Sequence, residues 1–175
     1  MKMTLDIARS RSGRRAPALA FACALLAAPP AAAAQGGLDN LASLATMTGT
    51  CASLVVRGAD VTNACEGRVL NSAHTDGRSG FAFIQGRSAI VSFAGQDSAA
   101  IGDRATLHVD MVLVARTDSG AAPKPEILRA TGECTYTNPY IGVSTIICRA
   151  ATSEGAFSAT FRSDGRPPEG QRFSH

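Results

Sequence analysis

Two residues near the middle of the chain have the types and spacing for acid–base chemistry. His108 and Asp110 lie two positions apart in the stretch LHVD, and residues two apart on a β-strand point to the same side. A carboxylate beside an imidazole can orient that ring as a general base or begin a metal site, and His74 is a third candidate for such a group.

The alternative interpretation of His108 and Asp110 is the ordinary polar face of a strand. We favour it because no nucleophile elbow, HExxH pair, phosphate-binding loop or dinucleotide fingerprint occurs in the sequence. The sequence therefore predicts no catalytic residue, no metal site and no cofactor, and His108, Asp110 and His74 remain the candidates for an enzymatic alternative.

The tyrosines are the second group of candidates. The chain has only two, Tyr136 and Tyr140, and both lie in the stretch TYTNPY. A tyrosine combines an apolar ring with a hydroxyl group, so two of them near a turn could contact a ligand or a partner. The alternative is that one covers the core and the other decorates the turn, which we favour because isolated exposed aromatic side chains are common.

Four cysteines follow a repeated spacing in which thirteen residues separate the members of each pair; they are Cys51, Cys65, Cys134 and Cys148. Structural zinc sites favour closely spaced C-x₂-C pairs, and redox sites use the same short motif. Neither motif occurs here. The spacing therefore predicts disulfides, although four cysteines allow three connectivities.

The sequence between the cysteines favours pairing within each interval. The first interval is centred on Gly58, and the second contains Asn138-Pro139 and Gly142 near its centre. These are turn residues, and strand-forming residues flank them on both sides. Each interval is therefore predicted to be a β-hairpin pinned by its own disulfide, Cys51–Cys65 in the first and Cys134–Cys148 in the second.

Residues 1–34 have the three parts of a secretory signal peptide. A basic stretch is followed by an apolar stretch over residues 16–28, by Pro29-Pro30 and by a run of alanines. Cleavage is predicted after Ala33 or Ala34. The alternative, an uncleaved membrane anchor, is disfavoured because spanning needs ~20 apolar residues and the two prolines interrupt the helix.

Cleavage would change the composition of the chain. The leader contains five of the seventeen basic residues and one of the fourteen acidic residues, so the formal net charge of +3 would become about −1. No basic cluster would remain to bind nucleic acid. Cys23 would leave with the leader, and the even set of cysteines fits an oxidising compartment. The sequence thus predicts a secreted or periplasmic protein with no stable membrane span after cleavage.

The remainder of the chain shows period-two patterns separated by turn residues. The longest is RATLHVDMVLVAR over residues 104–116. Strict alternation there places Leu107, Val109, Met111, Leu113 and Ala115 on one face; the other face then holds His108 and Asp110 together with Val112 and Val114. This pattern of short strands predicts an antiparallel β-sandwich or barrel.

The predicted fold is all-β, with about eight or nine short strands and two disulfide-pinned hairpins. One β-sandwich domain is expected over residues 35–166, followed by a flexible polar tail over residues 167–175. Its core should draw on the valines, isoleucines and leucines and on five phenylalanines, Phe81, Phe83, Phe93, Phe157 and Phe161.

Several short stretches resemble a known group of sequences: VSFAG, LHVD, TGEC, IIC followed by RA, and SDGRPP. The layout over residues 48–168 is similar to that of small exported bacterial β-rich proteins of uncharacterised function. The resemblance implies a β-rich exported domain and implies no activity.

The sequence therefore predicts an exported, non-catalytic binding or structural module of the periplasm or cell exterior. Its partner would be an envelope protein or an extracellular ligand. The alternative is a secreted hydrolase or metal-dependent enzyme that uses His108 and Asp110.

Overall fold

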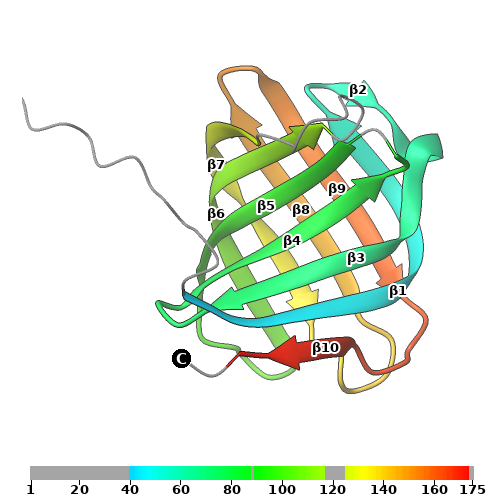
Figure 1. The fold of residues 1–175 in the computed structure, drawn as a ribbon, viewed down its shortest axis with the longest axis vertical. Coiled ribbons are helices and arrows are strands. Elements are labelled where there is room, and N and C mark those ends of the chain that lie inside the picture. Colours follow the sequence, from blue (N-terminus) through cyan, green and yellow to red (C-terminus); the bar gives the residue numbers. More distant parts are fainter. Residues whose placement is uncertain (1–39, 88, 117–124, 174–175) are drawn as a thin grey trace, which may run out of the picture. The chain divides into compact units, whose positions relative to one another are not determined.

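The computed structural model describes residues 40–87, 89–116 and 125–173, which form an antiparallel β-barrel (Figure 1). Ten strands lie in this part of the chain: β1 (Leu41–Val56), β2 (Ala59–Asp60), β3 (Cys65–His74), β4 (Arg78–Gln85), β5 (Ala89–Asp97), β6 (Arg104–Arg116), β7 (Glu126–Thr137), β8 (Thr145–Thr152), β9 (Gly155–Ser163) and β10 (Glu169–Arg172).

The barrel is an up-and-down meander of eight strands. The strand order is β1-β3-β4-β5-β6-β7-β8-β9, and β1 also pairs with β9, which closes the sheet. The two additional strands, β2 and β10, both pair with β1. The all-β prediction is thus confirmed, and of its two alternatives the barrel is correct.

Phenylalanine side chains fill much of the barrel interior. The five predicted core phenylalanines are each at most 2% exposed. The rings of Phe83 and Phe93 meet edge to face with their centroids 5.7 Å apart. An eight-stranded barrel has an interior just wide enough for side chains to fill, so these rings account for its packed core.

The assignment of buried and exposed faces predicted for the strand over residues 104–116 is wrong from Met111 onward. Leu107 and Val109 are buried as predicted, but beyond them Val112 and Val114 are the buried residues. The cause is a β-bulge, because the pairing of β6 with both of its neighbours shifts between Val109 and Met111. The extra residue, Asp110, reverses the inward and outward alternation of the remainder of the strand.

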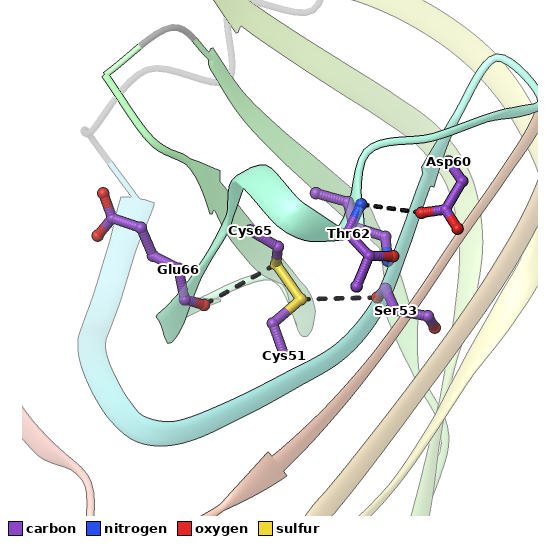
Figure 2. Close-up of a disulfide and its surroundings, with 7 residues drawn as sticks. Cys51, Ser53, Asp60, Thr62, Cys65 and Glu66 are labelled. Carbon is purple, nitrogen blue, oxygen red and sulfur yellow. Dashed lines mark hydrogen bonds between the residues drawn. A yellow bond between two sulfur atoms is a disulfide. The ribbon is translucent and has the colours of Figure 1, made fainter.

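Both predicted disulfides are present. Cys134 lies directly opposite Cys148 on β7 and β8, and both side chains are fully buried. The second disulfide joins Cys51 of β1 to Cys65 of β3 (Figure 2). The two predicted hairpins are confirmed in outline, since each disulfide links the two sides of its own turn.

The first hairpin is less regular than the second. It turns at Arg57 and Gly58, whose φ angles are 53° and 80°, as a two-residue type I′ turn requires. A short 3₁₀ turn at Thr62–Ala64 then interrupts the ladder before β3. Here the Leu54 amide donates to Thr62 Oγ1 and the Thr62 amide donates to Asp60 Oδ1, both at 2.9 Å (Figure 2 shows Asp60 and Thr62 beside the disulfide).

The C-terminal residues pair with the barrel. Within residues 167–175, which the sequence predicts to be a flexible polar tail, β10 pairs with Ser43–Thr46 of β1. The four residues of β10 are all exposed. The pairing therefore relies on backbone hydrogen bonds, which the polar composition of this segment does not reveal.

Candidate functional site

The two ends of the barrel differ in chemistry. At one end Arg57 forms ion pairs with the start of β7 and with the β8–β9 turn, with Nη2 2.6 Å from Glu126 Oε2 and Nε 2.7 Å from Glu154 Oε2. At the other end the β5–β6 loop (98–103) and the β7–β8 loop (138–144) border a cavity of about 280 Å³. Small-molecule sites typically enclose ~300–1,000 Å³, so this cavity suits a small ligand.

The wall of the cavity combines apolar side chains with a few polar groups. Its lining residues come from β1, β3, β4, β6, β7, β8 and the two loops: Met47, Asn71, Phe81, Ala100, Gly102, Asp103, Ala105, Tyr136, Asn138, Pro139, Tyr140, Ser144 and Ile146. An apolar wall with a small number of polar groups is the usual composition of a ligand pocket.

Tyr136 holds the best-defined polar group of the cavity. Its hydroxyl donates a hydrogen bond of 3.0 Å to Asp97 Oδ1 at the end of β5. Its ring meets Phe81 edge to face, with the centroids 4.9 Å apart. Burial, followed by the negative charge of Asp97, raises the pKa of Tyr136 above its ordinary value. The hydroxyl therefore stays protonated at neutral pH and its oxygen can still accept a hydrogen bond.

The β7–β8 loop is held in place by hydrogen bonds at both of its ends. The Asn138 amide donates to the Asp103 carbonyl at 3.1 Å, which links this loop to the β5–β6 loop. At the other end the buried Ser144 donates from Oγ to the Thr137 carbonyl at 2.7 Å, and its amide donates to Ser163 Oγ at 2.8 Å. The cavity wall is thus largely preformed.

Large apolar side chains are exposed around the mouth of the cavity. Ile101 is 86% exposed in the β5–β6 loop. Tyr140, Ile141 and Val143 in the β7–β8 loop are 63%, 76% and 47% exposed. Apolar groups gathered beside a cavity are typical of a binding surface, whereas the same groups scattered singly would mean little.

The structure places both predicted binding residues, Tyr136 and Tyr140, in the cavity wall. Tyr136 projects inward from β7, and Tyr140 stands in the loop at the mouth. The sequence did not indicate that Asn71, Phe81 or Asp97 belongs to this site, because they lie on β3, β4 and β5, far along the chain from the tyrosines. No local signal marks them, and only closure of the barrel brings them together.

His108 and Asp110 lie outside this cavity on the exposed surface of β6. Asp110 forms an ion pair with Arg78 of β4, with donor–acceptor distances of 2.8 Å and 2.6 Å. The carboxylate is thereby bound to a guanidinium and not to the imidazole. Arg78 also lowers the pKa of Asp110, mainly through the side-chain hydrogen bond.

His74 is not brought to His108. It ends β3 and its Nδ1 lies 3.0 Å from Asn40 Oδ1. Strands β4 and β5 separate β3 from β6, so the two histidines are three strand spacings apart, about 14 Å at ~4.8 Å per spacing. Within residues 40–87, 89–116 and 125–173, no three His, Cys, Asp or Glu side chains gather as a metal site requires.

The fold and the cavity define the class: a disulfide-bonded, closed eight-stranded antiparallel barrel with an apolar interior and a pocket at one end. No family model, curated protein or solved structure matches this chain. Among the described residues, no helix is long and apolar enough to cross a membrane.

Proposed function

We propose that this protein is an exported binding module that holds a small, mainly apolar molecule in the cavity at the β5–β6 and β7–β8 end of the barrel. The observation that carries the proposal is the cavity itself, which both tyrosines of the chain line, with exposed apolar side chains in the two loops that border it. Barrels with eight strands are known to enclose either packed side chains or one small ligand. The preformed wall supports binding, because little ordering is needed when a ligand enters.

Export is the second part of the proposal. It is supported by the basic, apolar and alanine-rich parts of residues 1–34 and by two disulfides in the barrel. The mature protein would then occupy the periplasm or the cell exterior, where its ligand would be extracellular. Mass spectrometry of the exported protein should find an N-terminus at residue 34 or 35, and a retained leader would contradict this part.

The binding proposal is tested by filling the cavity. Ala105 lines it, so Ala105→Phe should occupy part of its volume and abolish binding. The matched control is Ala151→Phe, because Ala151 is exposed on β8. Saturation-transfer NMR with a mixture of small aromatic compounds should show binding to the wild-type protein and to the control only. Equal signals from all three proteins, or none from the wild type, would contradict the proposal.

The hydrolase alternative has less support. It needs His108 and Asp110 to converge on one reacting atom, whereas Asp110 binds Arg78 on an exposed strand surface. Ester, peptide and glycoside substrates should therefore remain intact in the presence of the purified barrel. Hydrolysis that disappears in His108→Ala would reinstate the enzymatic alternative.

A further inference from the structure

Three aromatic rings line the cavity. The chain has no tryptophan and only two tyrosines, and both tyrosines line the cavity together with Phe81. Phe81 and Tyr136 meet edge to face, and Tyr140 stands at the mouth. The negative face of an aromatic ring attracts a cation, and several rings around one space form the cage that recognises alkylammonium groups.

The charges at the cavity have one sign. Asp103 is the charged side chain among the lining residues, and Asp97 lies one hydrogen bond behind the wall at Tyr136. No Lys, Arg or His lines the cavity within the described part of the chain. Arg104 follows Asp103 in the sequence, but it lies on the opposite face of the strand from the lining residue Ala105, and it is exposed. These carboxylates would therefore attract a cation into the cavity. They would repel an anion, which would find no positive charge there.

We propose that the ligand of this cavity is a small organic cation, an alkyl- or arylammonium compound. This inference rests on the proposed function, since it assumes that the cavity is a binding site. The ammonium group would lie against the rings of Tyr136 and Tyr140 on the side of Asp103, and the apolar part would contact Met47 and Ile146 in the deeper wall. Fatty acids and other apolar anions are excluded as preferred ligands.

Three compounds of matched shape separate charge from size. Benzyltrimethylammonium is the cation, neopentylbenzene is its neutral isostere, and phenylmethanesulfonate is the anion. Dissociation constants would be measured by NMR titration on the intact disulfide-bonded protein. We expect the cation to bind about tenfold more tightly than the neutral compound, because cation–π contacts and a nearby carboxylate together contribute on that scale. The sulfonate should bind more weakly than both.

Single substitutions test whether Asp103 and Tyr140 cause the preference for the cation. Asp103→Asn and Tyr140→Leu should each weaken cation binding severalfold and leave binding of the neutral compound nearly unchanged. Glu133→Gln is the matched control, because it removes one negative charge from an exposed position of β7 outside the cavity. The control should bind all three compounds as the wild type does, and unchanged thermal unfolding of each variant would show that the barrel is intact.

The outcomes distinguish the two proposals. Equal affinity for the cation and the neutral compound, or tighter binding of the sulfonate, overturns the cation inference. If that binding is also lost in Ala105→Phe, the cavity remains a binding site and the proposed function stands. If no compound binds, or if Ala105→Phe binds as the wild type does, both proposals fail.

Discussion

The Tyr136 hydroxyl donates to Asp97 Oδ1 at 3.0 Å and so joins the end of β7 to the end of β5 behind the wall of the cavity. The contact links strands that are not neighbours in the sheet, since β6 lies between them. Together with burial, which is the larger cause, this contact raises the pKa of Tyr136.

Removing this hydroxyl should change stability and its alkaline pH dependence. Tyr136→Phe should lower the free energy of unfolding at pH 7 by about 1 kcal/mol, the usual net contribution of a partly buried hydrogen bond. The pKa of Tyr136 is raised in the folded protein. Its contribution is therefore complete below the unfolded pKa of ~10 and is lost as the pH rises above that value, because only the unfolded chain ionises there.

Absorbance titration checks this prediction directly. With two tyrosines in the chain, about half of the tyrosinate absorbance should appear at a higher pH than in free tyrosine. That late step should vanish in Tyr136→Phe and persist in the control Tyr140→Phe. A late step that survives in Tyr136→Phe would contradict the assignment.

Gly95 lets β6 approach β5 at the bulge. A Cβ atom placed at Gly95 would lie 1.8 Å from the carbonyl oxygen of His108, which is backbone and cannot rotate away. Gly95→Ala should therefore cost about 3 kcal/mol of unfolding free energy, at the upper end of the range for overpacking. Gly80→Ala is the matched control in β4, where the nearest contact would be 3.1 Å. In urea denaturation, the free energy of unfolding of Gly95→Ala should be well below that of Gly80→Ala. Equal free energies would contradict the prediction.

The two disulfides should differ in their accessibility to reductant. Cys134 and Cys148 are fully buried, whereas Cys51 and Cys65 are partly exposed. Low concentrations of dithiothreitol should reduce Cys51–Cys65 first, while Cys134–Cys148 should persist until the barrel unfolds. Alkylation followed by peptide mapping would show the order, and earlier labelling of the buried pair would contradict it.

Each disulfide closes a loop of the same length and should contribute about 3 kcal/mol to the free energy of unfolding on the chain-entropy model.

The Arg78–Asp110 ion pair should have a small structural role. The two side chains are 31% and 56% exposed, and pairs of this kind contribute about 0.5–1 kcal/mol. Arg78 lowers the pKa of Asp110, so the contribution is present above the unfolded carboxyl pKa of ~4 and is lost as the pH falls through the lower folded value.

A double-mutant cycle with Arg78→Gln and Asp110→Asn measures this contribution. The coupling energy should be favourable at pH 7 and should shrink at pH 3. His108→Ala is the neighbouring control and should leave unfolding unchanged at pH 7. A large loss of stability in that control would point to a role for His108 that its exposed position does not suggest.

Local chemistry made parts of the fold predictable. Gly58 indicated a turn because its left-handed backbone conformation, with φ of 80°, is one that glycine adopts readily. The five phenylalanines were correctly assigned to the core because large apolar rings in strand patterns have few other places in a small barrel. The disulfide pairing was predictable because turn residues flanked by strand-forming residues lie between the two cysteines of each pair.

The failures came from contacts between distant strands. Val112 and Val114 on the supposedly polar face were the only hint of the bulge at Asp110, and the bulge depends on the registers of β5 and β7. The cavity was not predictable for the same reason. Asn71 and Tyr136 are separated by four strand connections and meet only when β1 and β9 close the sheet.

One edge of β1 is shared by two segments. β9 covers it from Gly49 to Val55, and β10 covers Ser43 to Thr46. Trimming the chain at Pro167 would therefore uncover a short row of unpaired amide and carbonyl groups on an otherwise continuous wall. A strand of another chain can pair with such a row. A second copy of this protein that has kept its C-terminus has a strand of this kind. Strand β10 thus covers backbone groups of β1 that a strand of another chain could otherwise pair with, and this cover depends on backbone geometry more than on the identity of any side chain.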